Sequence, residues 1–212
     1  MVAVDGPAGA GKSAVGRRVA EVLGLPFVDS GLFYRAVAWL ANEEGIPSAD
    51  VQRLVAIASR PDLRVEGGRV YAGDRDLTDL VYRPEINENL SAISQVAEVR
   101  DAINERQRRR AANRGVVMAG RDIGTVVFPD TPSKFFLTAG LAERVRRRLA
   151  QKAKRGERAD AAEMEREIAA RDIADSTRAV APLRPAPDAV IIDTDGLDVD
   201  QVVERIVERI GR

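Results

Sequence analysis

A run of eight residues near the N-terminus has the types and spacing of a phosphate-binding loop. In order they are Gly6, Pro7, Ala8, Gly9, Ala10, Gly11, Lys12 and Ser13. They fit the pattern G-x-x-x-x-G-K-[ST], in which backbone N–H groups surround the phosphates of a nucleoside triphosphate. In that pattern the Lys12 ammonium reaches the β- and γ-phosphates, and the Ser13 hydroxyl ligates Mg²⁺. The sequence therefore predicts a site for a nucleoside triphosphate.

The residues around this loop have the patterns of the two elements that a phosphate site needs. Residues 1–4 form a short apolar run, as expected for a buried strand. Residues 13–23 place Val15 and Val19 on one helical stripe, and Gly24 is the expected C-cap. A strand, a glycine-rich turn and a helix in this order direct the N-terminus of the helix at a bound anion.

The composition describes one globular domain and restricts its chemistry. The chain has 212 residues, of which 45% are hydrophobic and 31% charged, enough for one sizeable core. Its 33 basic and 33 acidic residues balance, and no apolar run approaches the roughly 20 residues that span a bilayer. The chain has no cysteine and no histidine, so catalysis must use carboxylates, cations and metal-bound phosphate. We expect a monomeric cytoplasmic enzyme without nucleic-acid or membrane partners.

Short apolar segments alternate with helical patterns along most of the chain. Strands are expected at residues 1–5, 26–28, 116–119, 134–138 and 189–193. Helices are expected at residues 13–23, 31–44, 48–59, in a long segment ending near Asn113, and at 141–155, 161–175 and 198–210. Because strands that are almost entirely apolar are covered on both faces, the alternation predicts an α/β fold with a five-stranded parallel sheet and flanking helices.

Two segments interrupt the alternation. Residues 63–80 have a short two-residue period around Gly67 and Gly68, which predicts a small antiparallel β insert. Residues 150–162 are almost all charged around Gly156 and lie between two helical patterns. They predict either a mobile hairpin or a solvated connection between helices, and composition alone favours neither.

Polar clusters follow the second and third expected strands. They are DSGLFYR at residues 29–35 and GRDIGT at residues 120–125. Because the carboxyl ends of parallel strands meet at one edge of a sheet, both clusters lie where ligands bind in open α/β folds. Ser30 is also a plausible N-cap of the next helix, and solvation alone would explain Arg35. Asp122 could serve the Mg²⁺ side of the phosphate loop or a second ligand.

A fourth cluster closes the helix expected at residues 161–175. Arg171, Asp175 and Arg178 have i, i+4 and i+7 spacing, so they lie on one helical face. A row of surface ion pairs would have the same spacing and little energetic value. Taken together, the clusters supply a lysine, several arginines and two carboxylates. That inventory suits phosphoryl transfer to an acceptor that is already phosphorylated, because the transition state spreads charge over phosphate oxygens.

Five stretches resemble the signature set of the bacterial cytidylate kinases, in that family's order. They are GPAGAGKS at 6–13, DSGLFYR at 29–35, SQVA at 94–97, AGRDIGTVVFPD at 119–130 and RDIADSTRAVAPL at 171–183. The resemblance covers nearly the whole chain and implies the fold of P-loop nucleoside monophosphate kinases. The core would then comprise about residues 1–59, 84–145 and 176–212. The β insert of the monophosphate-binding part would be about 60–83, and a helical ATP lid about 146–175.

The resemblance implies the reaction of ATP with CMP, or dCMP, to give ADP and CDP, or dCDP, with Mg²⁺. It implies that residues 6–13 and Ala14 bind ATP, with Ser13 at the metal. The implied catalytic residues are Lys12, Arg121 and Arg171. The implied CMP-binding residues are Ser30, Tyr34, Arg35, Ser94, Arg100, Arg121, Asp122, Arg171, Asp175 and Arg178. Of these, Ser94, Arg100 and Asp122 would read the cytosine edge, and Asp175 would contact the ribose hydroxyls.

One departure from the family pattern leaves the register of a site residue open. Fewer residues than usual separate Ser94 from Arg100, so Arg106 is an alternative for the same role. The sequence also leaves open the preference for CMP or dCMP and the tolerance of UMP.

Three other functions fit parts of the sequence. A GTPase-type switch would use the D-x-x-G run at 193–196, but this lies late in the chain and no N-K-x-D motif occurs. A shikimate-type kinase would explain the phosphate loop and the GRD cluster, but neither the β insert nor DSG-x-x-YR. RNA binding through the arginines at 106–110 or 144–148 would lack interleaved aromatic residues.

Overall fold

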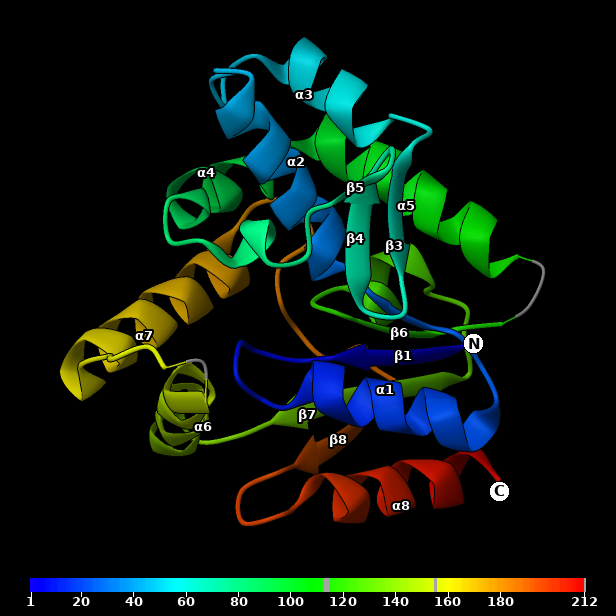
Figure 1. Cartoon of the computed structure of the whole chain (residues 1–212). Coiled ribbons are helices and arrows are strands. Elements are labelled where there is room, and N and C mark those ends of the chain that lie inside the picture. The colour runs from blue at the N-terminus through cyan, green and yellow to red at the C-terminus, as the bar shows by residue number, and fades with distance from the viewer. Residues whose placement is uncertain (113–114, 155, 212) are drawn as a thin grey trace.

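The computed structural model describes residues 1–112, 115–154 and 156–211, and its centre is a five-stranded parallel sheet (Figure 1). The strands are β1 (Val2–Asp5), β2 (Phe27–Asp29), β6 (Val117–Gly120), β7 (Ser133–Thr138) and β8 (Val190–Asp193). They lie in the order β2-β6-β1-β7-β8, and all neighbours are parallel. The predicted fold class and all five strands are confirmed. Because β1 is central, the loop that follows it opens at the middle of the carboxyl edge.

Helices cover both faces of the sheet (Figure 1). They include α1 (Lys12–Leu23), α2 (Gly31–Glu43), α5 (Ala97–Ala111) and α8 (Val199–Ile210). Val2 and Val4 of β1 join the core under α1 and α8, whereas Ala3 joins the core under α2 and α5. Successive strand side chains point to opposite faces, so a strand covered on both faces is apolar throughout. No helix in the described ranges is both long and apolar enough to cross a bilayer.

The predicted antiparallel insert is present as a three-stranded sheet. Its strands are β3 (Leu63–Glu66), β4 (Arg69–Ala72) and β5 (Arg75–Asp76). The turn between β3 and β4 is Gly67-Gly68, with φ values of 57° and 80°, which favour glycine. Leu63, Val65 and Leu77 are fully buried and belong to the same apolar core as α2 and α3 (Val51–Ala58). The insert therefore packs as a part of the main core.

The long helix expected to end near Asn113 is α5, and a separate short helix, α4 (Ile86–Ile93), precedes it. Asn113 itself lies outside the described residues. At the break, the Ser94 hydroxyl donates to the carbonyl of Ser91 (2.9 Å). Such local bonding competes with helix continuation, and the apolar period across the break does not reveal it.

The charged segment 150–162 is a connection between two helices. α6 (Leu141–Lys154) and α7 (Ala161–Thr177) pack side by side around Val145, Met164 and Ile168 (Figure 1). The described residues of the segment belong partly to the ends of these helices and partly to the stretch 156–160 between them. Residue 155, the expected end of the first helix, lies outside the described residues.

Candidate active site

The loop between β1 and α1 has a backbone that favours glycine. Gly6, Gly9 and Gly11 have φ values of 146°, 82° and 88°. A Cβ at Gly6 would lie only 2.1 Å from the carbonyl oxygen of Leu137. Gly11 is the N-cap of α1 and offers no side chain to the first N–H groups of that helix. These groups and the positive end of the helix dipole are available to an anion.

Lys12 and Ser13 have protein partners that fix their side chains. The buried Lys12 ammonium donates to the carbonyl of Pro7 (2.6 Å). The Ser13 hydroxyl donates to Oδ2 of Asp29 at the end of β2 (2.6 Å). Oδ1 of Asp29 accepts from the N–H of Gly31 (3.1 Å). Asp29 therefore links the start of α1 to the start of α2.

The predicted capping role of Ser30 is wrong in one respect. Ser30 is the residue before α2, but its hydroxyl makes no capping bond, and Asp29 receives the Gly31 N–H instead. The reason is that Ser30 has helical backbone angles (φ −62°, ψ −29°), whereas a capping residue is normally extended. Its side chain is buried against Gly120, where a Cβ would lie 2.7 Å from the Ser30 Oγ.

The predicted face of α7 gathers three arginines around one carboxylate. Oδ2 of Asp175 accepts from Nε of Arg121 (2.8 Å) and lies 3.9 Å from Nε of Arg171. Oδ1 of Asp175 lies 3.8 Å from Nη1 of Arg178. Arg121 comes from the loop after β6, so α7 reaches the carboxyl edge of the sheet. One carboxylate does not neutralise three guanidinium groups, and a positive charge remains.

The second carboxylate, Asp122, is buried beside two arginines. Its Oδ2 accepts from Nη2 of Arg100 (2.5 Å), and its Oδ1 lies 3.9 Å from Nη2 of Arg178. Arg100 also donates to the carbonyl of Ser94 (2.9 Å), and its guanidinium carbon lies 5.2 Å from the centre of the Tyr34 ring. The structure thus brings these five predicted residues together.

Two other arginines have separate positions. Arg106, the alternative to Arg100, donates to the carbonyls of Pro61 (3.2 Å) and Leu63, and so holds the insert against α5. Arg35 donates to the carbonyl of Val81 (3.1 Å) in the short helix η1 (Leu80–Tyr82). Of the two arginines that the sequence left open, the structure places Arg100 beside Asp122.

Burial and like charges shift the pKa of several cations in the site. The pKa of Lys12 lies well below its ordinary value because the ammonium is buried, and Arg121 and Arg171 lower it further. Burial lowers the pKa of Arg171 to about 9, and the nearby Arg121 and Arg35 add to this effect. An anion nearby favours the charged form of a base, so a bound polyphosphate would reverse these shifts. The electrostatics of the site therefore favour phosphate binding.

Asp5, a buried carboxylate beside the loop, belongs to none of the clusters predicted from the sequence. It accepts from the N–H groups of Ile123 (2.9 Å) and Gly124 (2.7 Å). Burial raises its pKa to about 6, and the nearby Asp122 adds to the increase. Asp5 is the last residue of β1 and directly precedes Gly6. It therefore lies at the carboxyl end of a parallel strand, as do Asp29 and Asp122, and its position in the sequence could have indicated it.

The residues after Asp122 form a π-helical turn that no sequence pattern predicted. It is η2 (Ile123–Val127), in which the N–H of Phe128 donates to the carbonyl of Ile123 (2.7 Å). Arg108 of α5 donates to the carbonyls of Val126 (2.8 Å) and Val127 (2.9 Å) at its other end. Turns of this kind occur frequently at functional sites.

The arginine runs on α5 and α6 are largely paired within the protein. Arg109 pairs with Glu105 and Arg110 with Glu66, while Arg146 and Arg147 share Glu143. Arg144 donates to the carbonyl of Ala8 (3.2 Å) in the phosphate loop and to Asp172 of α7 (2.5 Å). Each of these arginines therefore has a partner within the protein.

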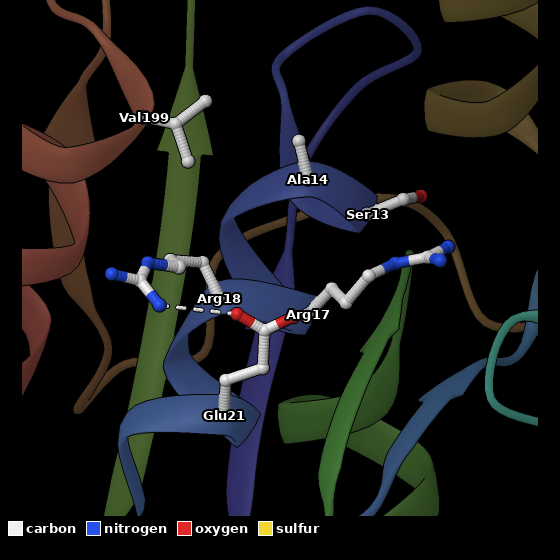
Figure 2. A pocket seen from close by; sticks show the side chains of 6 residues that line it. All are labelled: Ser13, Ala14, Arg17, Arg18, Glu21 and Val199. Carbon is white, nitrogen blue, oxygen red and sulfur yellow. Dashed lines mark hydrogen bonds and ion pairs between the residues drawn. The ribbon is translucent and has the colours of Figure 1, made fainter.

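An open groove of about 490 Å³ adjoins the phosphate loop on the outer side of α1 (Figure 2). Its lining consists of Ser13, Ala14, Arg17, Arg18, Glu21 and Val199. Figure 2 shows Arg18 and Glu21 paired along the helix (3.1 Å). The groove meets the site at Ser13 and is separate from the buried cations.

The raised pKa of Asp5 predicts a pH-dependent stability difference from Asp5→Asn. The pKa of Asp5 in the folded protein, about 6, exceeds the ordinary value of 3.8. The stabilisation that its protonated form contributes to folding is therefore complete below pH 3.8 and is lost as the pH rises through 6. Between pH 4 and pH 7 the free energy of unfolding of Asp5→Asn should rise by about 2 kcal/mol relative to that of the wild type. Urea unfolding of both proteins measures this, with Asp198→Asn at the exposed cap of α8 as control. A difference that does not change with pH would contradict it.

Comparisons with known proteins identify the family of this chain. The model of the cytidylate kinase family matches residues 2–212. The cytidylate kinase of Caldanaerobacter subterraneus subsp. tengcongensis is 42% identical over 211 residues, which cover 100% of this chain and 94% of that one. The cytidylate kinase of Desulforamulus reducens is 44% identical over 209 residues, which cover 97% of this chain and 94% of that one.

A solved structure is similar in fold. An uncharacterized protein from Eubacterium ventriosum superposes with a TM-score of 0.55 at 14% identity, covering 99% of this chain and 97% of that one. At this identity the likeness concerns the fold alone. The family match and the two relatives carry the assignment, because they extend over almost the whole chain. This chain belongs to the cytidylate kinase family, a family of phosphotransferases.

Proposed function

We propose that this chain transfers the γ-phosphoryl group of ATP to CMP, or to dCMP, and releases ADP and CDP, or dCDP. The observation that carries the proposal is the crowding of Arg121 and Arg171 near Lys12 of the phosphate loop, at the edge of the sheet where Asp122 also lies. Family membership supplies the reaction class. The geometry supports a role for each residue.

The donor would bind on residues 6–13 and Ala14. Its phosphates would lie at the N-terminus of α1, with Lys12 at the β- and γ-phosphates. The Ser13 hydroxyl and the Asp29 carboxylate, 2.6 Å apart, are oxygen donors that fit Mg²⁺. Among the described residues no three acidic side chains group to hold a metal, so ATP phosphates would supply most ligands. When bound, Mg²⁺ neutralises charge on the transferring phosphoryl group.

The cytosine of the acceptor would bind at Asp122. The exocyclic amine of cytosine is a hydrogen-bond donor and would reach the carboxylate, whereas uracil presents a carbonyl there. Arg100 and Arg178 hold that carboxylate from two sides. Ser94 would contact the same base edge, and the buried Tyr34 would support Arg100.

The phosphate and ribose of the acceptor would bind between α2 and α7. Arg35 and Ser30, with Arg121 and Arg171, would hold the phosphate, since guanidinium forks suit its oxygens. Asp175 would turn from the arginines to the ribose hydroxyls. A phosphate oxygen of CMP would then attack the γ-phosphorus while the bond to the bridging oxygen of ADP breaks. The oxygen is already anionic, so the step requires cations rather than a general base.

The helices α6 and α7 would form the lid of the enzyme. We assign the lid to about residues 146–175, the β insert of the monophosphate-binding part to about 60–83, and the core to the remainder. Closure would bring Arg171 and Asp175 onto both nucleotides and exclude water. We also propose that the enzyme is monomeric and acts in the cytoplasm.

A coupled ADP-release assay with several acceptors tests the function. CMP and dCMP should be phosphorylated at least tenfold better in kcat/KM than UMP, AMP, GMP or shikimate; against UMP the reason is that the amine of cytosine donates to Asp122 where uracil presents a carbonyl. Lys12→Met should lose roughly 10²–10³ in kcat, the usual effect of removing a transition-state donor, while Arg205→Met on α8 serves as control. Preferred turnover of shikimate would overturn the proposal.

Asp122→Asn should weaken CMP far more than ATP. The amide replaces one acceptor with a donor and removes the charge that holds Arg100 and Arg178. We expect KM for CMP to rise by roughly 10- to 100-fold, the range for one lost polar base contact, and KM for ATP to change less than about twofold. Initial rates at varied CMP and ATP measure both values. If both KM values rise equally, the carboxylate serves the metal instead.

A further inference from the structure

In the turn η2, which follows Asp122, the first backbone N–H groups donate to a side chain of strand β1. The first N–H groups of a helix have no partner within it and require an outside acceptor. Asp122 is the N-cap of η2, but its carboxylate makes no capping bond and faces Arg100 and Arg178. Asp5 of β1 accepts these N–H groups in its place, from Ile123 and Gly124.

We propose that Asp5 is a positioning residue of the acceptor site, which holds the backbone of η2 so that the Asp122 carboxylate is directed at the acceptor base. The inference rests on the proposed role of Asp122. In this role Asp5 touches neither nucleotide and acts through the main chain of Ile123 and Gly124.

The place of Asp5 in the sheet links the two halves of the site. Its backbone pairs with Gly120 of β6 on one side and Phe136 of β7 on the other. The next residue, Gly6, begins the phosphate loop. One residue therefore fixes the start of the donor loop through its main chain and the acceptor turn through its side chain. In the proposed function, the distance between the two nucleotides would depend on this residue.

The glycines around Asp122 fit this arrangement. A Cβ at Gly124 would lie 3.4 Å from Oδ2 of Asp5 and 3.2 Å from the side chain of Lys134. A Cβ at Gly120 would lie 2.6 Å from the side chain of Ile123. A larger residue at Gly120 would displace the Ile123 side chain, whereas one at Gly124 would meet Asp5 only at van der Waals distance, with the flexible Lys134 side chain closer. The G-R-D-x-G spacing thus permits the close approach that the carboxylate requires.

A purely structural role explains the carboxylate poorly. Asp5 is 5% exposed, and burying an ionised carboxyl group is unfavourable even when two N–H groups compensate it. A neutral side chain would fill the same space without that cost. What the carboxylate adds is two acceptor oxygens that face two adjacent N–H groups from one point.

The test is the acceptor selectivity of Asp5→Asn. Asparagine has the same shape, but its amide can accept only one of the two bonds and turns a donor toward the other N–H. We expect KM for CMP to rise about tenfold, KM for ATP to stay within about twofold, and the CMP-to-UMP ratio of kcat/KM to fall about tenfold. Asp5→Ser, which is also neutral and has one acceptor, should give the same loss of selectivity if Asp5→Asn does not fold.

The control variant makes the same chemical change elsewhere. Asp198→Asn alters a carboxylate that accepts a backbone N–H at the start of α8 and should leave both KM values and the selectivity unchanged. An unchanged CMP-to-UMP ratio in Asp5→Asn, or an equal rise in both KM values, would overturn the inference. Failure of the wild type to prefer CMP to UMP would instead overturn the proposed function.

Discussion

The active site depends on the mutual repulsion of buried cations that have too few carboxylates around them. Lys12, Arg121 and Arg171 act on one another at the carboxyl edge of the sheet, and the pKa of Lys12 and of Arg171 is lowered as a result of burial and this crowding. Such an arrangement is unfavourable until an anion arrives. In the proposed function, phosphate binding would relieve this electrostatic repulsion and would couple substrate affinity to the charge of the transferred group.

The fold maintains this crowding through a few connections. β1 lies between β6 and β7, and its end fixes both the phosphate loop and η2. α7 brings Arg171 and Asp175 to the same edge, and Arg144 ties the phosphate loop to α7 through Ala8 and Asp172. A movement of α6 and α7 would therefore change the hydrogen bond between Arg144 and the phosphate loop.

Asp122 and Asp175, the two carboxylates of the site that pair with arginines, have different surroundings. Asp122 is held by Arg100 and Arg178 in the interior, whereas Asp175 lies on α7 and faces Arg121. The buried position of Asp122 suits the reading of a base, because an unpaired polar group there costs the most. The position of Asp175 on α7 suits a group that would move with the proposed lid.

The sequence predicted the sheet and most helices because each depends on a local pattern. Strands covered on both faces are apolar throughout, and helices repeat every 3.6 residues. The clusters at residues 29–35 and 120–125 could be predicted to lie near the phosphate loop, because parallel strands end at one edge.

Features that depend on distant partners were missed. The turn η2 forms where Asp5 and Arg108 supply hydrogen bonds from far along the chain. Which of Arg100 and Arg106 lies beside Asp122 also could not be predicted. Both are on α5, and only their tertiary partners distinguish them: Asp122 for Arg100 and the carbonyl of Leu63 for Arg106. Ser30 has the residue type of a cap, but its backbone angles direct the side chain elsewhere.

The most direct test of the central claim is inhibition by cytidine and adenosine joined through five phosphates. If both nucleotides meet at one cluster of cations, this compound should compete with ATP and with CMP, and should bind more tightly than either, because linked ligands gain effective concentration. Competition with only one nucleotide, while the other still binds freely, would show that the two phosphate sites are separate and would contradict the account.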